Sequence, residues 1–287
     1  MSLSRRSLLG ASAVFLAAPA RAQDLPVLTG YEQQSGGKIG VYAENLKSGK
    51  KIAWRADERF VMCSTFKASL TALTLSRVDR GKEDLGRSVA FGPADVQDFY
   101  APHAKEKLAA GQDHMSIGEM CEAAVELSDN ACANLLLAAC GGPAALTAFW
   151  RSTGDTVSRL DHNEPVLNRS KPGDPHDTTT PMAMAGNLRR FLLGDVLSIG
   201  SRKRLLDWMI ACKTGANRLR GGLPAAWQIA DKTGNNGADA SGDIAMVWPA
   251  PDMPIVICVY TQGGKPSDAL IQSTFADIGR GVAQRLA

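Results

Sequence analysis

The stretch WQIADKTGNNGADASGDIAMVWPAPDMPIVICVYTQ, residues 227–262, decides the fold of this chain. It contains three runs rich in isoleucine, valine and alanine, separated by turn-forming residues, which is the pattern of consecutive strands: residues 227–234, 242–249 and 254–262. Near the other end of the chain, residues 38–45 and 51–57 are also β-prone, and the turn-forming residues between them predict a hairpin. We therefore expect one sheet to which both ends of the chain contribute.

The middle of the chain has helical periodicity instead. A helix is predicted from Ser64 to Val78, where leucines recur at helical spacing before Gly81. Ser116 and Glu119 form a capping box that begins another helix. Further helices are predicted over the following ranges: 131–140, from 143 onwards, 180–193, 201–212 and, at the C-terminus, 266–286.

Strands at both ends with helices between them predict a mixed α/β fold. We expect an antiparallel sheet of about five strands, flanked by the terminal helices, with an all-helical lobe inserted. The sheet domain would be discontinuous, comprising residues 23–59 and 213–287, and the helical domain would span residues 60–212.

The N-terminal segment has the features of an export signal. Arg5 and Arg6 precede an apolar run too short to cross a bilayer, and an Ala-x-Ala cleavage site ends at Ala22. The paired arginines favour the twin-arginine route, with an ordinary secretory signal as the alternative. We expect residues 1–22 to be removed and the mature protein to be periplasmic.

Charge and composition narrow the choice of partners. The signal carries three arginines and no acid, so the mature chain has 32 − 3 = 29 basic residues against 29 acidic ones. This balance gives no general attraction for nucleic acid or an anionic membrane. No second apolar run is long enough for a membrane anchor, so we expect a soluble monomer that acts on small molecules.

The six cysteines give no metal signature, because none lies in a Cys-x-x-Cys pair or at zinc spacing with histidine. Most lie in apolar surroundings, where a free cysteine behaves as a small hydrophobic residue. Twin-arginine export carries proteins that fold in a reducing cytoplasm, so we expect free thiols.

Four short motifs follow one another in the chain, and each supplies a different part of one reaction. They are Ser64-Thr65-Phe66-Lys67, Ser128-Asp129-Asn130, Glu164-Pro165-Val166-Leu167-Asn168 and Lys232-Thr233-Gly234. Taken singly, each motif also has a purely structural explanation. In the same order, these are a helix cap with a surface lysine, a generic helix start, a solvated loop and a strand end. Their fixed order favours the functional interpretation.

The first motif offers a nucleophile and a base. Ser64 and Lys67 lie one helical turn apart and so share a face. A serine hydroxyl needs a neighbouring base to become a good nucleophile. Lys67 can serve if burial and a second cation, Lys232, disfavour its charge. Ser128 and Asn130, in a loop between two helices, can both point into one cleft.

Glu164 and Asn168, four residues apart, can hold one water between them, with Glu164 as its general base.

A strand that carries a cation completes the set of motifs, but the chain has two Lys-Thr-Gly triads. Residues 213–215 follow a predicted helix, and their glycine looks like a helix stop. Residues 232–234 lie on a predicted strand, so we assign the site to them.

The ordered motifs resemble those of class A serine β-lactamases, and the resemblance runs from about Ile39 to the C-terminus. It implies an acyl-enzyme on Ser64, a Ser128 that protonates the leaving nitrogen, and an Asn130 that binds the substrate amide. It implies that Lys232 and Thr233 bind the substrate carboxylate beside Gly234. It also implies an oxyanion site formed by the backbone N–H groups of Ser64 and Asn235, and no cofactor or metal.

The resemblance extends to an Ω-loop over residues 159–177, closed by an ion pair between Arg159 and Asp177. Ser241 stands where many members carry an arginine, and an exposed Arg218 matches an alternative position for that carboxylate-binding group. His103 matches an aromatic residue at the mouth of the cleft. In one group of members a cysteine like Cys63 forms a disulfide, but its partner position here is Asn236.

Three other functions share part of this machinery. A DD-peptidase of the penicillin-binding type or a β-lactam sensor domain would be acylated but deacylate slowly, and neither needs the loop with Glu164 and Asn168. A serine esterase on the same scaffold would not need it either. The presence of Glu164 in its loop favours the β-lactamase.

Overall fold

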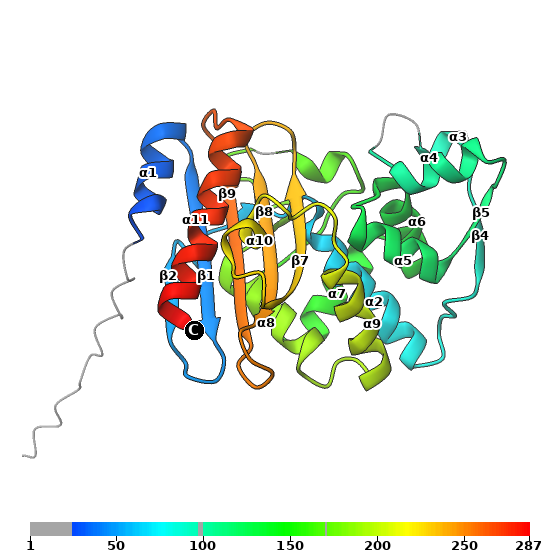
Figure 1. Ribbon diagram of the computed structural model, residues 1–287. Helices are drawn as coiled ribbons and strands as arrows, with labels where there is room; N and C mark the ends of the chain where they lie inside the picture. Colours follow the sequence, from blue (N-terminus) through cyan, green and yellow to red (C-terminus); the bar gives the residue numbers. More distant parts are fainter. Residues whose placement is uncertain (1–24, 97–99, 170) are drawn as a thin grey trace, which may run out of the picture.

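The computed structural model describes residues 25–96, 100–169 and 171–287; the expected signal segment, 1–22, lies outside them. Its central feature is a five-stranded antiparallel sheet in the order β2-β1-β9-β8-β7 (Figure 1). The strands are β1 (Lys38–Asn45), β2 (Lys51–Trp54), β7 (Gln228–Asn235), β8 (Ser241–Trp248) and β9 (Ile255–Gln262). The sheet predicted from both ends of the chain is confirmed.

The hairpin of β1 and β2 is shorter than predicted. Strand β2 ends at Trp54 rather than near residue 57. Arg55 has a φ of 43°, in the left-handed region, and a residue in that conformation cannot continue a strand. The Arg55 side chain is held there by Glu32 and Glu58, with nitrogen–oxygen distances of 2.7 and 2.8 Å.

The two faces of the sheet pack against different sets of helices (Figure 1). Helices α1 (Pro26–Ser35) and α11 (Asp268–Leu286) cover one face, and α8 (Pro181–Leu192) contacts the other. Strand β9 shows the alternation that this arrangement requires. Ile255, Ile257 and Val259 belong to the core under the terminal helices, whereas Cys258 and Tyr260 belong to the core shared with the helical lobe.

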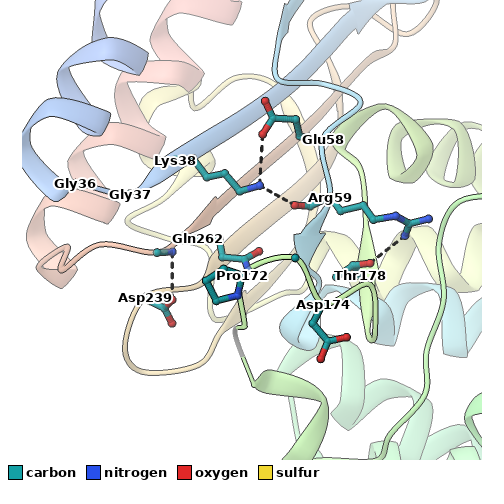
Figure 2. Close-up of a pocket in the computed structure, with 12 residues that line it drawn as sticks. Gly36, Gly37, Lys38, Glu58, Arg59, Pro172, Asp174, Thr178, Asp239 and Gln262 are labelled. Atoms are coloured by element: carbon teal, nitrogen blue, oxygen red, sulfur yellow. Dashed lines mark hydrogen bonds and ion pairs between the residues drawn. The ribbon is translucent and has the colours of Figure 1, made fainter.

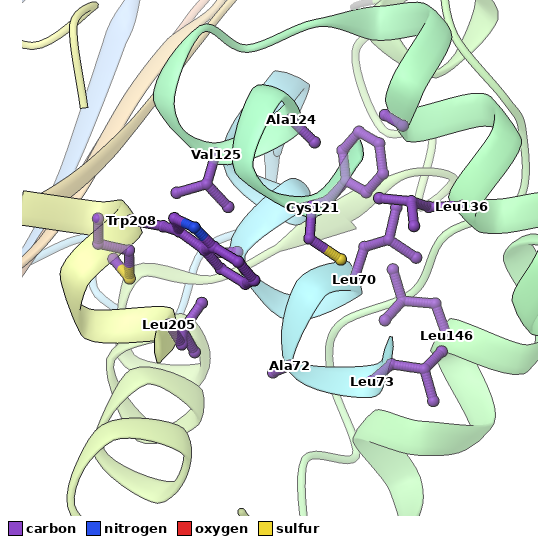
Figure 3. Packing of buried hydrophobic residues seen from close by; sticks show 14 of the residues in the cluster. Leu70, Ala72, Leu73, Cys121, Ala124, Val125, Leu136, Leu146, Leu205 and Trp208 are labelled. Atoms are coloured by element: carbon purple, nitrogen blue, oxygen red, sulfur yellow. The ribbon is translucent and has the colours of Figure 1, made fainter. Parts of the chain in front are cut away.

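The helical lobe surrounds α2 (Phe66–Asp79), in which every side chain from Phe66 to Ser76 is buried. The other larger helices of the lobe are α4 (Pro102–Ala109), α5 (Ile117–Glu126), α6 (Asn130–Cys140), α7 (Pro143–Ser152) and α9 (Ile199–Ile210). Figure 3 shows Leu70 of α2 close to Cys121 and Leu136, with Trp208 on the other side of the helix. A helix buried on all sides is held in place by packing from every direction.

Short elements connect these parts of the described chain. They are β3 (Phe60–Val61), η1 (Cys63–Thr65), β4 (Ser88–Ala90), α3 (Pro93–Val96), β5 (His114–Ser116), η2 (Val166–Asn168), β6 (Thr178–Thr179) and α10 (Leu219–Gly222). The predicted capping box is present: Ser116 Oγ accepts from Glu119 N–H, and the Glu119 carboxylate accepts from Ser116 N–H. The division into domains of 23–59 plus 213–287 and of 60–212 stays a prediction.

The cysteines, all within the described part of the chain, are buried with free thiols: Cys63, Cys121, Cys132, Cys140, Cys212 and Cys258. Among the described residues, no single helix has the length and apolar composition of a membrane span; the bent pair α6 and α7 meets these criteria only when its two helices are taken together.

Close packing of α10 on α11 depends on a glycine. A Cβ atom added at Gly222 would lie 1.7 Å from the carbonyl oxygen of Ala276, which is part of α11. Gly222→Ala should therefore push the two helices apart and lower the free energy of unfolding by about 1–3 kcal/mol or more. Urea denaturation of the purified protein measures this loss.

Gly200, in α9, is the matched control, because a Cβ there would meet no atom within 4 Å. Gly200→Ala should leave stability unchanged or raise it by up to about 1 kcal/mol. Equal stability of the two variants would show that α10 does not pack on α11 as described.

Candidate active site

The residues of the four motifs converge on a cleft where β7, the edge strand of the sheet, faces the helical lobe (Figure 1). The cleft has a volume of about 340 Å³. It is lined by Ser64, Tyr100, Ser128, Asn130, Asn168, Thr214, Arg218, Thr233, Gly234 and Asn235. Eight of the twelve residues expected at the site line this cleft directly, and they come from five separate segments of the chain.

Ser64 lies in the 3-10 turn η1, immediately before α2. The turn approaches β7 closely, because a Cβ on Gly234 would lie 2.8 Å from Met62 O and 2.9 Å from Ser64 N. Only glycine allows this approach without displacing the backbone. Gly234 therefore does more than border the cleft: it lets the strand lie against the turn that carries the serine.

Lys67, one turn further along, is wholly buried. Its Nζ donates to Ser64 Oγ at 2.9 Å, to Ser128 O at 2.8 Å and to Asn130 Oδ1. Glu164 Oε1 lies 3.3 Å away. Desolvation lowers the pKa of Lys67, and the nearby Glu164 carboxylate opposes this effect. A lysine with a lowered pKa is neutral more often and can accept a proton from Ser64.

Glu164 lies on the other side of the nucleophile, with Oε1 3.3 Å from Ser64 Oγ. Asn168 Nδ2 donates to Glu164 Oε2 at 2.5 Å. Asn134 of α6 holds the Glu164 backbone from both sides: its amide oxygen accepts from Glu164 N and its Nδ2 donates to Glu164 O, each at 3.0 Å. Asn134 was missed by the sequence reasoning, although it lies four residues after Asn130 on the same helix face.

Ser128 has a φ of 61°, which turns the chain sharply before α6. Its Oγ accepts from Lys232 Nζ at 3.0 Å and lies 3.5 Å from Lys67 Nζ. The hydroxyl thus lies between two amines and can pass a proton between them and a bound molecule. Asp129 points away from the cleft and caps α6 by accepting from Cys132 N–H.

Lys232 is also wholly buried. Burial is the main cause that lowers its pKa, to about 8, and the neighbouring cation Lys67 acts in the same direction. Thr233 Oγ1 and Thr214 Oγ1 are 2.5 Å apart. Thr214 belongs to the other Lys-Thr-Gly triad, so that triad contributes a threonine to the cleft while its lysine, Lys213, is exposed.

Arg218 lines the cleft but is mostly buried, which corrects the expectation of an exposed arginine. One guanidinium nitrogen, Nη1, donates to Gly234 O at 2.8 Å and to Gly242 O at 2.7 Å. Desolvation lowers the pKa of Arg218. The arginine therefore joins β7 to β8 and at the same time borders the cleft.

His103 does not reach the cleft, and its expected place at the cleft mouth is corrected. It lies in the first turn of α4, where its ring nitrogen is 3.0 Å from Glu119 Oε1 and its backbone N–H donates to Asp129. The aromatic side chain that lines the cleft is Tyr100, which is 60% exposed. Pro102 begins α4 and turns the chain away after Tyr100, so the residue three positions further on faces α5.

The neck of the loop 159–177 also differs from expectation. Arg159 pairs with Asp161, at 2.5 Å, rather than with Asp177. Asp177 accepts instead from the backbone N–H of Asp161 at 2.7 Å and from His162, through its backbone at 3.0 Å and its ring at 2.6 Å. Asp161 in turn accepts from Asp177 N–H at 3.0 Å. Two aspartates that cap each other's backbone close the neck.

Among the described residues, no group of three or more histidine, cysteine, aspartate or glutamate side chains is arranged to hold a metal ion. The chemistry available in the cleft is that of a serine with two amines, a carboxylate and several amides. Such a set can form and break an acyl–oxygen bond.

The fold and this cleft define a serine hydrolase of the penicillin-recognising kind, and comparisons with known proteins give its family. A profile described as the beta-lactamase enzyme family matches residues 22–286. The chain is 46% identical over 256 residues to Beta-lactamase L2 of Stenotrophomonas maltophilia, covering 89% of this chain and 83% of the relative. The chain belongs to the beta-lactamase enzyme family.

Solved structures agree with this assignment. An ancestral (GNCA) class A β-lactamase superposes with a TM-score of 0.85 at 51% identity, covering 90% of this chain and 97% of the other. A β-lactamase from Xanthomonas campestris pv. campestris superposes with a TM-score of 0.87 at 39% identity, covering 91% and 97%. The mixed α/β architecture is that of the class A enzymes.

The lowered pKa of Lys232 predicts an alkaline limit to activity. Lys232 is a cation below its pKa of about 8 and neutral above it, so any attraction that it exerts on an anionic ligand is present at lower pH and lost as the pH rises. The value of kcat/KM should fall above about pH 8. Lys232→Arg should move this limb to higher pH, since arginine stays charged. If the alkaline fall of kcat/KM stays at the same pH in the variant, it reports the titration of a group other than Lys232.

Proposed function

We propose that this protein is a serine β-lactamase that opens the β-lactam amide through an acyl-enzyme on Ser64 and then hydrolyses that ester with a water activated by Glu164. One observation carries the proposal. Two candidate bases flank one nucleophile, since Ser64 Oγ lies 2.9 Å from Lys67 Nζ and 3.3 Å from Glu164 Oε1. A reaction in two covalent steps needs a base for each step.

In the acylation step, Lys67 takes the proton of Ser64, whose Oγ attacks the lactam carbonyl carbon. The backbone N–H groups of Ser64 and Asn235 stabilise the negative oxygen that forms. Ser128, 3.5 Å from Lys67 Nζ, passes a proton to the leaving nitrogen as the ring opens. The ester on Ser64 keeps the opened substrate in the cleft.

In the deacylation step, Glu164 removes a proton from a water that attacks the ester carbonyl, and Ser64 recovers its proton. Asn168 supports this role with both ends of its side-chain amide. Its Nδ2 fixes Glu164 Oε2, and its Oδ1 is buried without a protein partner and can accept from the attacking water. Neither a DD-peptidase nor a sensor domain needs this pair, which favours the β-lactamase over both.

Substrate binding falls to the groups along β7. Lys232, Thr233 and Arg218 supply positive charge and a hydroxyl for the substrate carboxylate. Asn130 and the edge of β7 bind the side-chain amide. We further propose that residues 1–22 direct export to the periplasm, that the enzyme acts as a monomer without a membrane anchor, and that it protects its host from β-lactam antibiotics.

Glu164→Ala should separate the two steps. Acylation retains Ser64, Lys67 and the oxyanion donors, whereas deacylation loses its base, which is worth roughly 10²–10⁴-fold. The variant should accumulate a covalent penicillin adduct, visible as a mass increase of the intact protein, while the native enzyme shows little at the same time point.

The control is the double variant Ser64→Ala with Glu164→Ala, which should form no adduct. A native enzyme that itself stays acylated would support the DD-peptidase or sensor function. Turnover of Glu164→Ala at the native rate would remove Glu164 as the deacylating base.

Arg218→Ala should lower kcat/KM for a penicillin, mostly through KM, because it removes a cation from the carboxylate site. The expected loss is about 1–3 kcal/mol in transition-state binding. Because Arg218 also bonds Gly234 and Gly242, the penicillin methyl ester is needed as a control. An equal loss for acid and ester would assign Arg218 a structural role alone.

A further inference from the structure

The turn between β7 and β8, residues 236–240, touches the loop that carries Glu164. Asn236 Nδ2 donates to the backbone oxygen of Asn168 at 3.3 Å. Within the described residues, this is the one side-chain hydrogen bond between the turn and the loop 159–177. It joins the sheet to the residue that orients the Glu164 carboxylate.

Asn236 is itself held rigidly. Its Oδ1 accepts from the backbone N–H groups of three successive residues, Ala238 to Ala240, at 3.0–3.1 Å. Its Nδ2 also donates to Asp239 Oδ1 at 2.9 Å. An amide that uses its acceptor and both donors in this way has one orientation.

Asp239 extends the support to the next strand. Its second carboxylate oxygen accepts from Gly263 N at 3.2 Å, at the end of β9 (Figure 2). A chain of hydrogen bonds thus runs from Gly263 through Asp239, Asn236 and Asn168 to Glu164. Its first members lie in the turns at the ends of β9 and β7, and its last is the proposed base.

Residues 172–174 of the loop border a cavity. This cavity of about 520 Å³ lies between Pro172, Gly173 and Asp174 and the adjoining ends of β1 and β9, and Asp239 lies on its wall (Figure 2). Side chains that face a cavity lack packing partners on that side. Next to Asn168, Leu167 is wholly buried in the core of the helical lobe, and the hydrogen bond from Asn236 adds a link from this part of the loop to the turn after β7.

We propose that Asn236, backed by Asp239, is a positioning residue for deacylation. By holding the Asn168 backbone, it keeps the Asn168 amide where it orients the Glu164 carboxylate toward the acyl-enzyme. The inference rests on the proposed function of Glu164. It assigns Asn236 no contact with the reacting atoms, and acylation, which uses Lys67, should depend on it little.

Asn236→Asp tests the proposal, because it keeps the oxygen that accepts from the turn and replaces the donating nitrogen with a second oxygen. Stopped-flow measurement of a single turnover with a penicillin separates the two rates. Acylation should change by less than about 3-fold, while deacylation should fall by roughly 10–100-fold, the loss expected when a catalytic group is misplaced. The acyl-enzyme on Ser64 should become detectable by intact mass.

The double variant Asn236→Asp with Asp239→Asn is the matched control. It restores an amide–carboxylate hydrogen bond inside the turn but not the donor to Asn168. Its melting temperature should recover toward the native value while deacylation stays slow. If the melting temperature and the deacylation rate both recovered, the turn would act only through stability, and the proposal would be overturned. A folded Asn236→Asp variant that deacylates at the native rate would overturn it as well.

Failure of the role proposed for Asn236 and failure of the proposed function give different results. If Glu164→Ala accumulates acyl-enzyme but neither Asn236 variant does, the role of Asn236 is wrong and the role of Glu164 stands. If Glu164→Ala accumulates none, the function proposed for Glu164 is wrong, and the role proposed for Asn236 is wrong as well.

Discussion

An amine that lies wholly inside a protein must find hydrogen-bond partners there, and Lys67 finds them on three segments of the chain. Ser64 lies in the turn η1 just before the helix of Lys67, Ser128 and Asn130 lie at the start of α6, and Glu164 lies in the loop that follows α7. These segments are far apart in sequence, and the buried amine brings them to one point. Loss of the amine would leave unpaired polar groups on each of them.

The second constraint is the contact between the sheet and the helical lobe. Strand β7 can lie against the turn of Ser64 because Gly234 has no side chain, and Arg218 joins that strand to β8 through Gly234 O and Gly242 O. The cleft lies between the sheet and the helical lobe, with Lys232 of one bonded to Ser128 of the other. The two sides of the site therefore differ: Ser64 and Lys67 belong to packed elements, while Glu164 is supplied by a loop.

Sequence reasoning identified the sheet because residues such as 254–262 form continuous apolar runs rich in isoleucine and valine, which are typical of strands buried on both faces. It separated the two Lys-Thr-Gly triads because only one lies on a strand. It misplaced His103, because the turn made by Pro102 decides which of several nearby residues faces the cleft. It also mispaired Arg159, since Asp161 and Asp177 are both acidic and only the folded loop shows which carboxylate the guanidinium reaches. Burial of Arg218 follows from strands that are distant in sequence.

The burial of α2 from Phe66 to Ser76 has a consequence for the way in which this protein would lose activity. The backbone N–H groups of such a helix exchange with solvent only when the whole lobe opens, so the serine at its N-terminus keeps its geometry as long as the fold lasts. The loop that carries Glu164 faces a cavity at residues 172–174, and a segment with fewer packing partners opens locally at a lower cost in free energy than a buried helix. Under gentle heating or dilute denaturant, the proposed reaction should therefore lose its second half first. The protein would then be acylated once on Ser64 and would retain the opened antibiotic as a stable acyl-enzyme instead of turning it over.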